Sequence, residues 1–212
     1  MSSDRMQRIE TCEEAVLDVL NEHYFVNGCT WREASSYDVA RHQSFHVAKA
    51  IAKMADAFWR PSLESYVRLK NEVLADLLIY AIELGDAFYV EWATDVCFDS
   101  APATDGCDPF ATSQGRSAFA GWLGSMIEAA SRLGEVCDRA DHGAVAGVDV
   151  GREIAQVFGR VGAELAGWFG LDITDCLIVR LGDMAEKYID RAAKPLHDTR
   201  ERDVLVPARR SI

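Results

Sequence analysis

The sequence predicts an all-α protein, and two observations lead to that prediction. Apolar residues recur at the three- and four-residue spacing of helices through most of the 212-residue chain, and no segment shows sustained two-residue alternation. Residues 72–91 and 153–172 also share an ungapped pattern at a shift of 81 positions, in which Glu72 falls on Glu153 and Phe88 on Phe169. Because self-similarity indicates a repeated structural unit, we expect one helical bundle built from two tandem hairpins.

The first half of the chain contains the first three predicted helices. Serine and aspartate cap helix N termini, and proline cannot continue a helix, so these residues set the expected boundaries. The helices are expected over residues 8–24, from Ser36 or Asp38 to Pro61, and from Ser62 through Trp92. Residues 1–98 therefore form an N-terminal helical half, with its hairpin over residues 36–98.

A break rich in Pro, Gly, Asp, Ser and Thr follows, and it predicts a connecting loop over residues 99–114. The second half, residues 115–191, is predicted to contain helices over 117–138, 151–169 and 173–191. Residues 192–212 mix charges with a short apolar run, which is typical of a tail.

Composition limits the possible partners of the chain. The net charge of −12 repels the phosphate backbone, so duplex nucleic acid is not expected as a partner. No apolar run approaches the length of a membrane span and the first residues are polar, so we expect no membrane partner and a cytoplasmic location. The six cysteines form no CxxC pair, which favours free thiols. A nucleotide can still bind if divalent cations bridge the two sets of negative charge.

Several segments resemble one family. Residues 71–90 (NEVLADLLIYAIELGDAFYV) resemble the third-helix signature of the all-α nucleoside triphosphate pyrophosphatases, the superfamily that includes MazG and the dimeric dUTPases. Residues 131–138 (SRLGEVCD) and 45–59 (FHVAKAIAKMADAFW) are similar to the preceding helix of that fold, and residues 171–188 to its closing helix. The resemblance covers residues 36–191 and implies two tandem MazG-like hairpins in one chain.

The resemblance also implies an activity and a cofactor. In this family an E-x-x-E motif on one helix faces an E-x-x-D motif on the next, and the carboxylates hold Mg²⁺, or Mn²⁺ in its place. The metal neutralises the triphosphate and orients the attacking water. The implied enzyme is a magnesium-dependent nucleotide pyrophosphohydrolase, which converts a (deoxy)nucleoside triphosphate to the monophosphate and pyrophosphate.

Both halves depart from the family motifs. The first E-x-x-E position reads Lys53-Met-Ala-Asp56, and the second reads Arg132-Leu-Gly-Glu135. On the partner helices the acidic residues that remain are Glu72 and Asp76 in the first half and Glu153 in the second. The expected catalytic residues and first-half metal ligands are therefore Asp56, Glu72 and Asp76. A second set of metal ligands, active or vestigial, consists of Glu135 and Glu153, with Asp138 nearby. The expected nucleotide contacts are Lys53 and Lys70 to phosphate and Trp59 to the base.

The same residues allow a second interpretation. Glu72 and Asp76 can instead pair with Lys53 and with Arg68 or Lys70, which would leave a polar seam without a metal. The chain would then be a catalytically degenerate MazG-like module that acts in dimerisation, nucleotide sensing or protein–protein interaction. A homodimer is expected under either interpretation.

Overall fold

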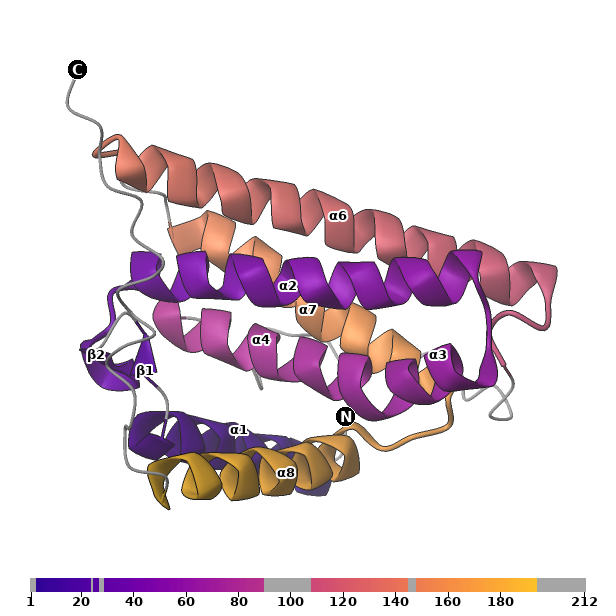
Figure 1. The fold of residues 1–212 in the computed structure, drawn as a ribbon, viewed down its shortest axis with the longest axis horizontal. Helices are drawn as coiled ribbons and strands as arrows, with labels where there is room; N and C mark the ends of the chain where they lie inside the picture. The colour runs from indigo at the N-terminus through magenta and orange to yellow at the C-terminus, as the bar shows by residue number, and fades with distance from the viewer. Residues whose placement is uncertain (1–2, 24, 27–28, 90–107, 145–147, 194–212) are drawn as a thin grey trace.

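The computed structural model describes residues 3–23, 25–26, 29–89, 108–144 and 148–193, and it confirms the all-α prediction (Figure 1). A pair of two-residue antiparallel strands, β1 (Phe25–Val26) and β2 (Cys29–Thr30), and a 3-10 turn (Trp31–Glu33) follow the first helix. The helices are α1 (Ser3–His23), α2 (Ser36–Trp59), α3 (Leu63–Arg68), α4 (Leu74–Ala87), α6 (Ser113–Asp141), α7 (Val148–Trp168) and α8 (Ile173–Ala193), with a π-helical segment (Leu69–Val73) between α3 and α4.

Helices α2, α4, α6 and α7 form a bundle. Helices α2 and α6 are antiparallel, because Tyr37 near the start of α2 bonds to Asp141 at the end of α6. Helices α4 and α7 are also antiparallel and approach closely at two glycines of α7. A Cβ atom on Gly162 would lie 2.8 Å from Leu78 Cδ2, and one on Gly151 would overlap the ring of Phe88.

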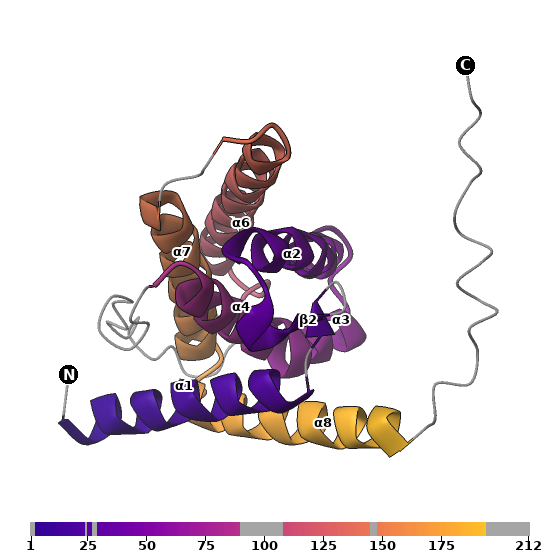
Figure 2. The same ribbon diagram turned by 90° about the vertical axis from the view of Figure 1, so that its left-hand side faces the viewer.

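Helix α4 is the central element of the bundle. Every residue from Val73 to Gly85 is buried except Asp76. A helix that is apolar on all sides needs neighbours on all sides. Helices α2 and α7 cover two of its faces, and α1 and α8 pack against each other and against a third. In Figure 2, α1 and α8 form a separate layer beneath the bundle.

The helix ends follow local capping, with small shifts from the predicted boundaries. Ser35 caps α2 by accepting a hydrogen bond from the Asp38 amide, so the cap lies one residue before the expected Ser36. Thr112 caps α6, which therefore begins at Ser113, inside the segment predicted as a loop. Helix α4 ends at Ala87, whereas the sequence predicted a helix through Trp92, a residue outside the described part of the chain.

The short strands were not predicted, since two residues are too few to show a strand pattern. The π-helical segment was not predicted either. Among the helices described, none combines the length and apolar character that a membrane crossing requires.

Candidate functional site

Two of the predicted site residues come together on the face of α4 that meets α2. The π-helical segment contains Glu72, and Asp76 lies one turn later on α4. Lys53 of α2 donates a hydrogen bond to Glu72 Oε2 at 2.8 Å. This hydrogen bond lowers the pKa of Glu72 below its usual value, against a smaller opposing effect of burial.

Asp76 has a different basic partner, which comes from outside the bundle. Arg180 of α8 places its guanidinium 2.8 Å from Asp76 Oδ1, and only 13% of the Asp76 side chain is exposed. Burial raises the pKa of Asp76, and the nearby Arg180 opposes that shift. The Asp76–Arg180 pair therefore lies in a drier environment than the Lys53–Glu72 pair.

The third predicted ligand of the first half forms an ion pair within its own helix. The Asp56 carboxylate lies 3.6 Å from the guanidinium of Arg60, four residues later. Within the described ranges, no group of three His, Cys, Asp or Glu side chains has a geometry that could hold a metal ion. The carboxylates that converge here, Glu72 and Asp76, each hold a basic side chain instead.

One of these contacts, the Lys53–Glu72 ion pair, has a similar pair later in the chain. Arg132 of α6 forms a short ion pair with Glu153 of α7. The other predicted residues of this half, Glu135 and Asp138, are exposed on α6. The Asp138 carboxylate lies 3.8 Å from the His142 ring.

These two ion pairs occupy corresponding positions. Arg132 lies 79 positions after Lys53, and Glu153 lies 81 positions after Glu72. In both segments aligned with the E-x-x-E motif, a basic residue replaces the first glutamate. That basic residue pairs with the glutamate on the facing helix.

A second pair of contacts follows the same correspondence. Gln43 donates to the buried carboxyl of Glu83 between α2 and α4, and Trp122 donates to Glu164 between α6 and α7. Trp122 again lies 79 positions after Gln43, and Glu164 lies 81 positions after Glu83. The α2–α4 and α6–α7 pairs of helices therefore share two interhelical polar contacts in the same register.

The predicted nucleotide contacts are spread over the surface. Lys70 lies half-buried on the π-helical segment, near Cys176 of α8. Burial raises the pKa of the Cys176 thiol to about 11, and the positive charge of Lys70 opposes that rise. Trp59, at the end of α2, is 73% exposed and packs edge-on against Phe58. Of these predicted residues, Lys53 lies beside a predicted metal ligand.

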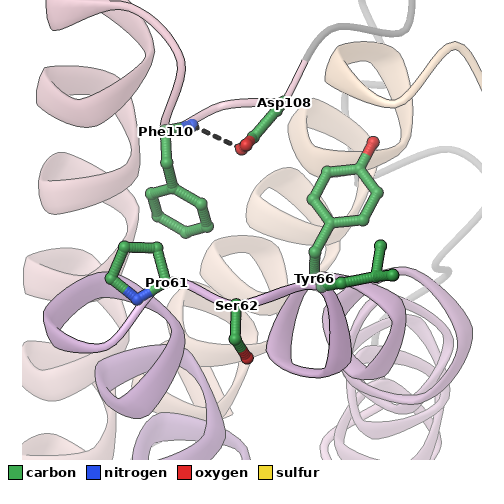
Figure 3. A pocket seen from close by; sticks show the side chains of 6 residues that line it. Pro61, Ser62, Tyr66, Asp108 and Phe110 are labelled. Atoms are coloured by element: carbon green, nitrogen blue, oxygen red, sulfur yellow. Dashed lines mark hydrogen bonds between the residues drawn. The ribbon is translucent and has the colours of Figure 1, made fainter.

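A hollow of about 400 Å³ lies between the end of α2 and the start of α6. In Figure 3 the ring of Phe110 lies above Pro61, and the ring of Tyr66 stands on the opposite side of the opening. Asp108 is held at the rim by the hydrogen bond that its carboxylate accepts from the Phe110 amide. The lining is mostly apolar with an acidic group, so it suits an apolar side chain better than a phosphate.

Sequence reasoning missed Arg180 and Gln43. Nothing in their spacing marks them, because each gains its partner through packing between helices that lie far apart in the chain. Comparison of the chain with protein-family models, with curated proteins and with solved structures finds no match.

Proposed function

We propose that this chain is a non-catalytic MazG-like helical module, in which two tandem hairpins are retained for packing and association. The observation that carries the proposal is the pair of matching ion bridges, Lys53–Glu72 and Arg132–Glu153. Each places a cationic side chain on the glutamate that would hold Mg²⁺ in a MazG-like enzyme.

The physical argument is one of competition for the same carboxylates. Mg²⁺ binds carboxylate oxygens at about 2.1 Å in a near-octahedral shell. An ammonium or guanidinium group at hydrogen-bond distance neutralises the carboxylate and repels an incoming cation. Three such groups, on Lys53, Arg132 and Arg180, act on the predicted ligands.

The correspondence of contacts supports the tandem-hairpin part of the proposal. Two helix pairs that share the Lys53–Glu72 type of bridge and the Gln43–Glu83 type of hydrogen bond, in one register, fit a duplicated unit. Phe88 and its counterpart Phe169 are also both buried, at the ends of the compared segments.

The pyrophosphohydrolase is the second candidate, and one observation favours it. Glu72 and Asp76 share a helix face beside Lys53 and Arg180. Mg²⁺ often binds through one or two carboxylates plus substrate phosphates. In this candidate, a metal–triphosphate complex displaces both basic groups from the carboxylates, and the basic groups then contact the phosphates.

A pyrophosphate-release assay separates the two candidates. Wild-type protein is incubated with a panel of ribo- and deoxyribonucleoside triphosphates and with Mg²⁺ or Mn²⁺. The module proposal expects no turnover. Metal-dependent release of pyrophosphate that disappears in Asp76→Ala would reject it and establish the enzyme.

A gain-of-binding variant tests the competition argument directly. Lys53→Glu removes the cation and adds a carboxylate opposite Glu72, so we expect Mg²⁺ to raise the melting temperature of this variant and not that of the wild type. Lys49→Glu is the matched control, because Lys49 is an exposed lysine one turn earlier on α2. A Mg²⁺ effect of equal size in the wild type would contradict the argument.

The module is expected to act as a homodimer. Helix α8 exposes Ile178 and Val179, at 57% and 67%, on the layer outside the bundle. Light scattering coupled to size-exclusion chromatography measures the mass directly, and a monomer at all concentrations would exclude the dimer.

A further inference from the structure

The outer face of α2 carries two large apolar side chains that are exposed to solvent. Phe45 is 65% exposed, and Trp59, the last residue of the helix, is 73% exposed. Ala52 lies midway between them and is also exposed. Because the three residues are seven positions apart, they form one straight stripe along the helix, like the seam of a coiled coil. Figure 2 shows α2 on the side of the bundle opposite α7.

Two residues of opposite charge lie on the same stripe. Lys49 is exposed four positions after Phe45, and Asp56 lies four positions after Ala52. The helical repeat of 3.6 residues places them with the three apolar residues in an arc of about 80°. The Asp56 carboxylate is 43% exposed and lies 3.6 Å from Arg60, so it can accept a further hydrogen bond. We call these residues the α2 stripe: Phe45, Lys49, Ala52, Asp56 and Trp59.

The α2 stripe matches a reversed copy of itself. When two α2 helices lie antiparallel with Ala52 at the two-fold axis, Phe45 faces Trp59 of the partner subunit, because each lies seven positions from Ala52. Lys49, three positions before Ala52, then lies opposite Asp56 of the partner subunit, four positions after it. The small side chain of Ala52 allows the two helices to approach closely. A two-fold interface needs a surface of this self-complementary kind.

We propose that α2 forms a homodimer interface by packing antiparallel against α2 of a second copy of this chain. Phe45 and Trp59 bury their rings against the partner helix, and the ion pairs between Lys49 and Asp56 select the antiparallel register. A parallel pair would place lysine beside lysine and aspartate beside aspartate, so the charges disfavour it. The inference rests on the homodimer expected under the proposed function, and it names the face that forms it.

The exposed apolar residues of α8 are less suited to pair with themselves. Val179 has an aspartate four positions away on each side, at Asp175 and Asp183, and both are exposed. An antiparallel pair of α8 helices centred on Val179 would therefore place two acidic residues opposite each other and gain no ion pair. The α2 stripe offers both apolar surface and charges that match.

Sedimentation equilibrium of the full-length protein tests the interface. Ala52→Arg places two guanidinium groups together at the two-fold axis, so the dissociation constant of the dimer should rise at least about tenfold. Ile178→Arg is the matched control at an exposed position of α8, and it should leave the dissociation constant unchanged. Circular dichroism checks that both variants are folded. A dimer that persists in Ala52→Arg, or that is lost in Ile178→Arg, would overturn the proposal.

A charge exchange tests the register. Lys49→Glu and Asp56→Lys each place like charges opposite one another, so each should weaken the dimer at least about tenfold. The double variant restores opposite charges and should return the dissociation constant to near the wild-type value. A double variant as weak as the single variants would show that the two residues do not meet, and it would refute the antiparallel pairing.

The outcomes also separate this interface from the proposed function. A wild-type dimer that is unaffected by the α2 variants removes the α2 interface and leaves the expected homodimer in place. A wild-type monomer at all concentrations removes both. Pyrophosphate release reports on catalysis alone, so its result stands apart from either outcome.

Discussion

Glu83 carries a carboxyl group in the interior of the bundle, at 2% exposure, where it accepts a hydrogen bond from the Gln43 amide. Burial, with a further contribution from Asp76, raises the pKa of Glu83 well above the usual value. The folded state therefore holds this proton more tightly than the unfolded chain does. It follows that Glu83 destabilises the fold progressively as the pH rises above about 4.5.

Replacement of Glu83 by glutamine should stabilise the protein at neutral pH. A glutamine amide can donate to Gln43 Oε1, which is buried without a partner, and it carries no charge. We expect the melting temperature at pH 7 to rise by a few degrees, equivalent to about 1 kcal/mol or more. At pH 4, below the ordinary pKa of 4.5, the wild-type carboxyl is mostly protonated in both states, so the gain should be smaller.

The measurement is thermal unfolding followed by circular dichroism at both pH values. Glu164→Gln is the control, because Glu164 is the corresponding residue of α7 and is only partly buried. A gain of equal size at pH 4 and pH 7 would show that the charge of Glu83 is not the cause.

The two ion pairs of the first half should differ in their contribution to stability. The Lys53 and Glu72 side chains are 32% and 46% exposed, so solvent screens that pair and Lys53→Met should cost at most about 1 kcal/mol. The Arg180 and Asp76 side chains are 27% and 13% exposed, and Arg180→Met would leave a poorly solvated carboxylate. We expect it to cost about 1–3 kcal/mol.

Urea unfolding of the two variants measures this difference. The double variant Arg180→Met with Asp76→Asn should recover part of the loss, because the unpaired charge is then absent. Equal losses from Lys53→Met and Arg180→Met would contradict the assigned difference in burial.

At the scale of the elements, the α4–α7 contact depends on glycine. A methyl group at Gly151 would overlap the Phe88 ring, so Gly151→Ala should lower stability by about 1–3 kcal/mol through overpacking. Gly124→Ala is the control, since Gly124 lies on α6 with open space around its Cβ position. There alanine should stabilise by about 0.4–1 kcal/mol, because it restricts the unfolded chain. Denaturant titration gives both values, and a stabilising Gly151→Ala would contradict the close approach.

The sequence predicts the helices well because periodicity and caps are local. Pro61 and Ser62 set the α2–α3 turn, and the register of Glu72 with Asp76 follows from their spacing alone. The basic partners of these carboxylates cannot all be predicted from local spacing. Arg180 reaches Asp76 only because α8 packs on α4 over a separation of 104 positions, and no local pattern encodes that contact.

At the scale of the whole molecule, α4 and α7 correspond in sequence and contact but differ in what covers them. The α4 residues Ala75, Ile79 and Ile82 are buried. Their counterparts 81 positions later, Gln156, Arg160 and Ala163, are exposed or half-exposed. This difference falls on one stripe, because residues three and four apart share a helix face. We infer that the stripe on α4 is the surface that α1 and α8 cover, since both pack on α4.

This asymmetry predicts opposite outcomes for two reciprocal substitutions. Ile79→Arg buries a charge at a site of 2% exposure and should destabilise the protein by about 3 kcal/mol or more. Arg160→Ile, at the corresponding exposed position of α7, should change stability by no more than about 0.5 kcal/mol. Chemical denaturation of both full-length variants gives the two values. Similar effects of the two substitutions would show that α1 and α8 do not cover this stripe. The predicted difference would show that α1 and α8 bury the stripe on α4, whereas the corresponding stripe on α7 needs no such cover.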